Sequence, residues 1–180
     1  MKRILIILAA LVACSVTGAK AQFYGIKVNT LGLATGTVNA GAEVSVAKQW
    51  SVELSGYWNP IKTDRFSSRF WYVQPAARYW LYEHFVGHFV AAHPVYGRYR
   101  VGNDLWYYKG WLTGVGFSYG YTWILTKRWN LTAEGGIGFY YMRDRKRLHH
   151  IDPWQPECVT NYRRWIAAPS KLEVAFSYLF

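Results

Sequence analysis

The chain has 180 residues, of which 52% are hydrophobic and 17% charged, with 21 lysines and arginines against 10 acidic residues. This excludes a disordered chain, which would be poor in aromatic residues and rich in charge. Two cysteines exclude a disulfide-stapled scaffold and a four-cysteine zinc module. The length fits one domain or two small ones.

The first predicted element is a signal peptide over residues 1–21. Lys2 and Arg3 form a basic start, residues 4–13 are an apolar run too short to span a bilayer, and residues 19–21 form a small-residue cleavage site. An alternative is a lipobox in which Cys14 is acylated. The mature domain, residues 22–180, contains no apolar stretch long enough for a transmembrane helix.

The mature domain alternates with a period of two, which is the spacing of a β-strand. The clearest segment, residues 111–125, has large aromatic and aliphatic residues on one face and glycine and hydroxyl residues on the other. That contrast is typical of a membrane barrel, whose outer face contacts lipid. Pro94 leaves the facing of one strand open. Eight segments are predicted, around residues 23–33, 38–46, 50–58, 70–81, 88–100, 111–125, 131–141 and 171–180.

These segments predict an all-β fold, an eight-stranded antiparallel transmembrane β-barrel closed as an up-and-down meander. Short connections are expected near residues 47–49, 83–87 and 126–128. Longer ones are expected at residues 60–69, 101–109 and 143–169, and the short connection at residues 35–37 is an exception to the alternation. Bacterial barrels have short periplasmic turns and longer outer loops, so we expect the bacterial outer membrane.

Tryptophans near both sets of connections predict two aromatic belts, because Trp and Tyr favour membrane interfaces. Those near the short turns are Trp50, Trp80, Trp123 and Trp129, and those near the longer loops are Trp58, Trp71, Trp111 and Trp165. The chain then ends in alternating aromatics up to Phe180. This end looks like the signal read by the barrel-assembly machinery, an expected partner.

Several motifs resemble a family of small outer-membrane barrel proteins of unknown function from Bacteroidota. They are Asn59-Pro60, Gln74-Pro75, Arg78-Tyr79-Trp80, Gly87-His88-Phe89 and, most specifically, residues 110–129. The resemblance covers nearly all of the mature chain, and the family is similar in plan to the eight-stranded OmpA-like barrels. It implies envelope or adhesin biology near fimbria-like surface proteins, and it supplies no catalytic or ligand residue.

Charged residues at inward-facing positions predict a network that plugs the lumen. Unpaired buried ions are costly, and the interior of an eight-stranded barrel is only wide enough for its own side chains. A small gated pore is the alternative. A soluble lipocalin-like barrel would need apolar residues inside instead. The predicted network comprises Lys27, Glu43, Glu53, Arg78, Glu134, Lys171 and Glu173.

The predicted outer loop at residues 143–169 is the most basic part of the chain. Its binding candidates are Arg143, Arg145, Lys146, Arg147, Arg163 and Arg164. Arginine and lysine bind phosphate well, so we expect contact with lipopolysaccharide. A host glycan or a protein partner is the alternative. Nucleic acid is not expected, because no base-reading fold accompanies the charge.

Metal and cofactor chemistry is not predicted. His149, His150 and Cys158 are of ligand types, but their spacing matches no established site. An alternative role for Cys158 is the formation of an intermolecular disulfide.

The predicted function is therefore structural or surface-interacting, as an accessory of a fimbria-like assembly, and not enzymatic. The alternative is a lipid-active acyl hydrolase or transferase in the same barrel. It would draw on His88, His93, Ser118 and Glu134, but no histidine lies two residues from a serine in this set.

Overall fold

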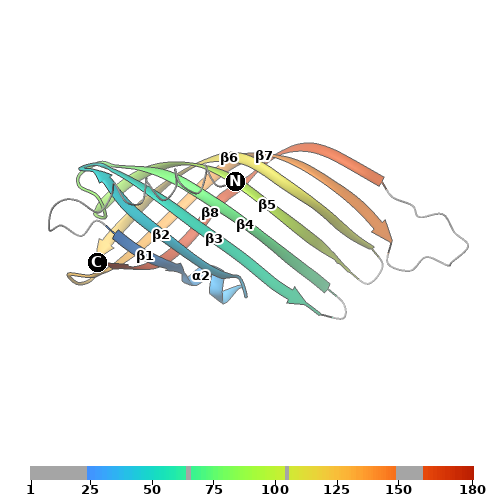
Figure 1. Ribbon diagram of the computed structural model, residues 1–180, viewed down its shortest axis with the longest axis horizontal. Coiled ribbons are helices and arrows are strands. Elements are labelled where there is room, and N and C mark those ends of the chain that lie inside the picture. Colours follow the sequence, from blue (N-terminus) through green and yellow to red (C-terminus); the bar gives the residue numbers. More distant parts are fainter. Residues whose placement is uncertain (1–23, 64–65, 104–105, 149–159) are drawn as a thin grey trace, which may run out of the picture.

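The computed structural model describes residues 24–63, 66–103, 106–148 and 160–180. They form a closed barrel of eight antiparallel strands in chain order, in which β1 pairs with β8 (Figure 1). The predicted eight-stranded all-β meander is thereby confirmed. The predicted signal peptide and Cys14 lie outside the described residues. The elements are β1 (Tyr24–Asn29), α2 (Thr30–Ala34), β2 (Val38–Ala47), β3 (Trp50–Lys62), β4 (Phe66–Trp80), β5 (Gly87–Asn103), β6 (Trp106–Ile124), β7 (Trp129–Leu148) and β8 (Thr160–Leu179).

The two ends of the barrel differ in how far the strands project. At the turn end, residues 48–49, 81–86 and 125–128 connect the strands. At the opposite end, the loop end, the later strands extend beyond the earlier ones (Figure 1). β3 has 13 residues in all, whereas β7 and β8 have 20 each. The predicted long connections at residues 60–69 and 101–109 are shorter than expected, and the bounds 143–169 were wrong, because strands cover 143–148 and 160–169 whereas residues 149–159 lie outside the described part. Strands occupy most of each range, because ladder hydrogen bonds join backbone groups and do not require apolar side chains.

The first strand is shorter than predicted, because the chain turns into α2 at Thr30. The side chain of Asn29 caps this helix by accepting a hydrogen bond from the backbone N–H of Gly32. The backbone N–H of Asn29 donates to the Asn39 side chain over 2.6 Å. Residues 30–34 are therefore a helical connection and not part of a strand. None of the helices among the described residues is long and apolar enough to cross a membrane.

A β-bulge in β8 reverses which residues face outward. Gly136 pairs with Lys171 whereas Ile137 pairs with Pro169, so Ser170 is the extra residue. Below the bulge the exposed residues of β8 are even-numbered, as at Leu172, whereas over residues 165–169 just above it they are odd-numbered, as at Trp165. A strict period-two pattern along β8 therefore predicts the facing correctly on only one side of the bulge.

An aromatic cluster closes the lumen at the turn end. Trp80, Phe85 and Phe89 are each at most 5% exposed, and Arg78 lies over the Phe89 ring with its guanidinium carbon 4.5 Å from the centroid. The prediction that Trp80 belongs to an outer aromatic belt was wrong. Trp80 lies two residues from Arg78 on one strand, so both side chains face the lumen, where the Trp80 indole N–H donates to Ser51 Oγ over 2.8 Å.

Candidate functional site

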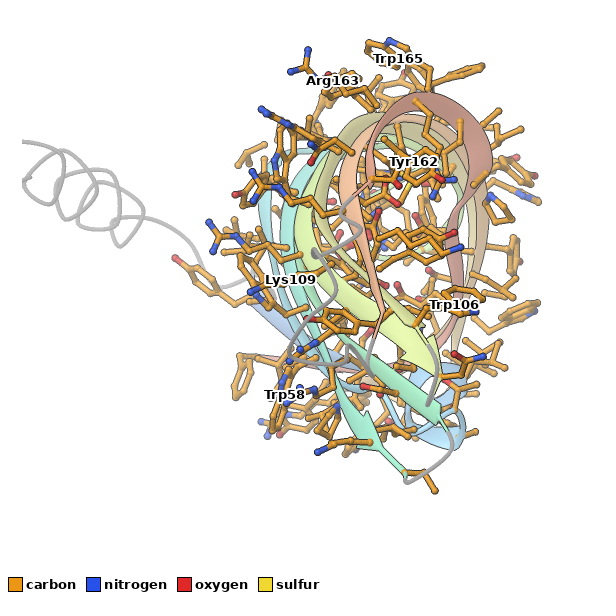
Figure 2. The ribbon with its side chains drawn as sticks, turned by 90° about the vertical axis from the view of Figure 1, so that its right-hand side faces the viewer. Trp58, Trp106, Lys109, Tyr162, Arg163 and Trp165 are labelled. Carbon is orange, nitrogen blue, oxygen red and sulfur yellow. The ribbon has the colours of Figure 1, made fainter. Side chains whose placement is uncertain are left out.

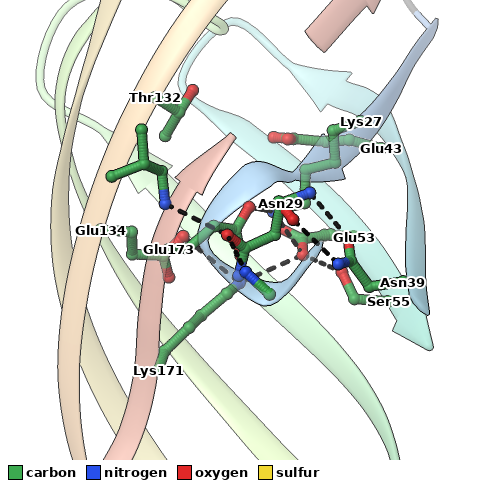
Figure 3. Close-up of polar contacts among 12 residues, drawn as sticks. Lys27, Asn29, Asn39, Glu43, Glu53, Ser55, Thr132, Glu134, Lys171 and Glu173 are labelled. Carbon is green, nitrogen blue, oxygen red and sulfur yellow. Dashed lines mark hydrogen bonds and ion pairs between the residues drawn. The ribbon is translucent and has the colours of Figure 1, made fainter. Parts of the chain in front are cut away.

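The seven charged residues predicted to line the lumen lie there together, each at most 7% exposed. Figure 3 shows all of them except Arg78 with labels. The seven residues come from six of the eight strands. We call this set the lumen cluster; it consists of Lys27, Glu43, Glu53, Arg78, Glu134, Lys171 and Glu173.

Arg78 connects one side of the lumen cluster. Its guanidinium lies 2.8 Å from a carboxylate oxygen of Glu43 and 2.5 Å from oxygens of both Glu53 and Glu134. One planar guanidinium group therefore forms ion pairs with carboxylates from three strands, β2, β3 and β7. Arginine suits this position because its donors are spread over a fixed plane.

Glu53 is contacted by all three cations of the lumen cluster. Its carboxylate lies 2.7 Å from Lys27 Nζ and 3.1 Å from Lys171 Nζ, in addition to the contact with Arg78. Lys27 also lies 2.5 Å from Glu173, and Lys171 lies 3.3 Å from Glu134. The pairs form one connected network and not isolated bridges.

Strand register explains why the cations are needed between the carboxylates. Glu43 is directly opposite Glu53 on β2 and β3, and Glu134 is directly opposite Glu173 on β7 and β8. Like charges placed opposite each other across a strand pair are destabilising. The three cations enter from β1, β4 and β8 and separate the two acidic pairs.

Each carboxylate of the lumen cluster also accepts a hydroxyl hydrogen bond, which the sequence analysis missed. The donors are Ser51 to Glu43 (2.5 Å), Ser55 to Glu53, Ser118 to Glu134 (2.6 Å) and Tyr57 to Glu173 (3.2 Å). All four donors have the same inward facing as the charged residues, and this was the signal available in the sequence.

A cavity of about 290 Å³ lies above the cluster, toward the loop end. Lys171 and the bulged Ser170 line the side of the cavity that faces the lumen cluster. Tyr57 and Tyr72, stacked with ring centroids 4.4 Å apart, form part of its wall. Aromatic and charged side chains thus fill the lumen toward the turn end, and this cavity lies on their loop-end side.

The outward face of the barrel has two aromatic belts. At the turn end Trp50 packs against Tyr79 and Trp129 against Tyr178, each with ring centroids 5.1 Å apart. At the loop end the contacts run Trp71–Tyr96, Trp111–Tyr141 and Tyr141–Trp165. No outward-facing residue of the described strands between the belts is acidic, lysine or arginine. Exposed apolar residues of this band include Val52, Leu54, Val115, Phe117, Ile137, Phe139 and Leu172.

The predicted binding candidates lie on strands β7 and β8 and not on a loop. Arg143, Arg145 and Arg163 are exposed on the outward face, and Figure 2 shows Arg163 pointing away from the barrel. Arg164 instead bonds the buried Asp144 over 3.2 Å, and Lys146 lies over the Trp106 ring at 4.9 Å. The side chain of Arg147 is outside the described part, as are His149, His150 and Cys158.

Other cations join these three on the outward face. Arg98 is paired with Trp111, which is paired with Arg143, and Lys109 is paired with both Arg100 and Arg145. Sequence reasoning missed them because it placed Arg69 and Lys109 in loops and left open the facing of the strand that contains Arg98 and Arg100. We give the name outward basic rim to seven of the cations on this face, which are Arg69, Arg98, Arg100, Lys109, Arg143, Arg145 and Arg163.

Comparison with known proteins assigns a family. A family model described as "Protein of unknown function (DUF3575)" matches residues 5–180. The chain belongs to the DUF3575 family. No curated protein and no solved structure gave a match. The family description therefore assigns no activity to this eight-stranded closed barrel with a charged lumen.

The residues of the enzyme alternative are not joined in this DUF3575 barrel. His88 lies on the outward face, with its Nδ1 2.5 Å from the hydroxyl of Tyr119. His93 is 1% exposed inside the lumen, and neither of its ring nitrogens has a hydrogen-bond partner among the described residues. A Cβ on Gly116 would lie 2.5 Å from His93 Nε2, so this glycine makes room for the ring. Ser118 is bonded to Glu134, and neither His88 nor His93 is hydrogen-bonded to Ser118.

Proposed function

We propose that this DUF3575 protein is an outer-membrane β-barrel with a structural or surface-interaction role and a closed lumen. The observation that carries the proposal is the uncharged apolar band between the two aromatic belts, combined with charges collected inside. A soluble protein rarely exposes so continuous an apolar surface. A barrel in lipid requires it.

The spacing of the belts supports membrane insertion. From Trp50 to Trp58 on β3 is eight residues, and from Trp111 to Trp123 on β6 is twelve, which correspond to about 26 and 40 Å along the strands. Strands tilted by about 40° shorten these lengths to about 20 and 30 Å, which bracket the height of about 25 Å of the apolar band of known barrels.

The test is cell fractionation combined with gel electrophoresis of boiled and unboiled protein. We expect the protein in the outer membrane and a band that shifts on heating, because a closed barrel resists detergent until heated. A soluble periplasmic protein without a shift would refute the proposal. Intact mass of the mature protein would distinguish cleavage after Ala21 from acylation of Cys14.

The proposed role is not enzymatic. We further propose that the protein is an accessory of a fimbria-like assembly in a Bacteroidota envelope. Among the described residues neither His88 nor His93 is hydrogen-bonded to Ser118, which supports the first part, and the family resemblance supports the second. Deleting the gene should leave the lipid A profile unchanged in mass spectrometry and should lower the amount of assembled surface fimbriae. A changed lipid profile, restored by the wild-type gene but not by Ser118→Ala, would favour the enzyme instead.

A further inference from the structure

The outward basic rim begins at the level of the loop-end aromatic belt. Trp111 lies in the same outward row as Arg98 and Arg143, and the next outward row contains Lys109 and Arg145. Successive outward rows are two residues apart, about 7 Å along a strand. The cations therefore lie at the level where the headgroups of an inserted bilayer would meet water.

The rim has no acidic residue to neutralise it among the described residues. Five of the six described acidic residues are buried in the barrel interior, and the sixth, Glu83, is in a turn at the opposite end. Asp144 is nearest in sequence, but it is 1% exposed and pairs with the inward-facing Arg164. No carboxylate of the described residues therefore pairs with any of the seven cations.

Four of these cations surround one concavity. A pocket of about 400 Å³ is lined by Arg98, Lys109, Arg143 and Arg145, together with Gly110 and Trp111. Several guanidinium groups around one pocket suit phosphate, because each can bind it through two parallel N–H···O bonds.

An apolar groove of about 690 Å³ lies on the same side of the barrel and extends from Phe117 to Trp50 and Tyr79 of the turn-end belt. Small residues such as Ala77, Ala92 and Gly135 lie beside the larger Phe117 in its lining. From Trp111 to Phe117 is six residues, about 20 Å along the tilted strand, which is within a hydrocarbon core about 30 Å thick. These strands therefore offer a cationic pocket at headgroup level and a groove at acyl-chain level.

We propose that the pocket between Arg98, Lys109, Arg143 and Arg145 binds the phosphate groups of a phosphorylated glycolipid of the outer leaflet. Its acyl chains lie along the apolar groove. The inference rests on the proposed membrane placement and names the lipid class for the surface interaction.

The test uses the full mature chain in nanodiscs of zwitterionic lipid, with binding of diphosphoryl lipid A measured by native mass spectrometry. Lipid A stripped of phosphate, with the same acyl chains, is the matched probe. The variant K109Q/R143Q/R145Q should bind diphosphoryl lipid A roughly 100-fold more weakly, at about fivefold per cation removed. The control K48Q/K127Q/R128Q removes the same charge at the turn end and should bind as the wild type does.

Equal binding of the two lipids by the wild-type protein would overturn the proposal, as would an equal loss in the control variant. Inorganic pyrophosphate that displaces lipid A at equal concentration would assign the pocket to free phosphate and overturn the lipid assignment. If the triple variant lacks the heat shift of a folded barrel, K109Q and R143Q singly should each weaken binding about fivefold. If the protein fractionates with the outer membrane but binds lipid A equally with and without phosphate, this inference alone is refuted. If the protein is soluble, the proposed function is refuted.

Discussion

The lumen cluster and the outward basic rim each contain seven charged residues, but the charges are compensated differently. In the lumen, three cations and four carboxylates lie within ion-pair distance, and each carboxylate accepts a hydroxyl as well. On the rim, all seven are cations, and no described carboxylate shares their face. The lumen charges pair with one another and thereby join six strands, whereas the rim charges have no carboxylate partner among the described residues and, in our proposal, bind an external phosphate.

The largest expected effect comes from removing Arg78. Arg78→Met leaves Glu43 without any cation among the described residues and removes one cation from both Glu53 and Glu134. Breaking a buried ion network by removing one partner costs about 3–5 kcal/mol. We expect a loss of that size in the free energy of unfolding, measured by urea titration in detergent.

Two further variants sharpen this prediction. Lys48→Met removes an exposed cation in a turn and should leave stability within about 0.5 kcal/mol of the wild type. Arg78→Lys keeps the charge but loses the planar fork, so its stability should fall between those of the wild type and Arg78→Met. Wild-type stability in Arg78→Met would show that the lumen network does not hold the barrel together.

Removing the carboxylate with the most contacts should cost less than removing Arg78. After Glu53→Gln, Lys27 retains Glu173, Lys171 retains Glu134, and Arg78 retains two carboxylates. Because no charge is left alone, the expected loss is that of hydrogen bonds to charged groups, about 1.5–3 kcal/mol. The same urea titration checks the order of the two variants. A larger loss for Glu53→Gln than for Arg78→Met would contradict the pairing described here.

The strand alternation was sufficient to predict the number of strands, the closed meander and all seven members of the lumen cluster. It also contained the facing of Trp80, since that residue is two positions from Arg78. The wrong assignment came from using proximity to a turn instead of parity. Parity is the stronger criterion, because a strand cannot turn one side chain to the other face without a bulge.

The rim was harder to predict for two physical reasons. Strands that extend beyond the apolar band keep their ladders but lose the apolar alternation, so Lys109 appeared to belong to a loop. Arg98 was placed in a strand, but Pro94 left the facing of that strand open. The bulge at Ser170 then reversed the facing of β8, so Arg163 and Arg164 could not be assigned from the pattern below it. Both features depend on pairing between distant strands, which one sequence does not contain.

The smallest expected effect on stability comes from the rim itself. K109Q/R143Q/R145Q removes three exposed cations that have no ion pair among the described residues, so its unfolding free energy in zwitterionic detergent should stay within about 0.5 kcal/mol of the wild type. Adding diphosphoryl lipid A should then stabilise the wild type more than the variant, because a ligand stabilises only the state it binds. A large loss for the variant in detergent alone would mean that the rim charges support the fold. In that case the contrast between lumen and rim would no longer hold.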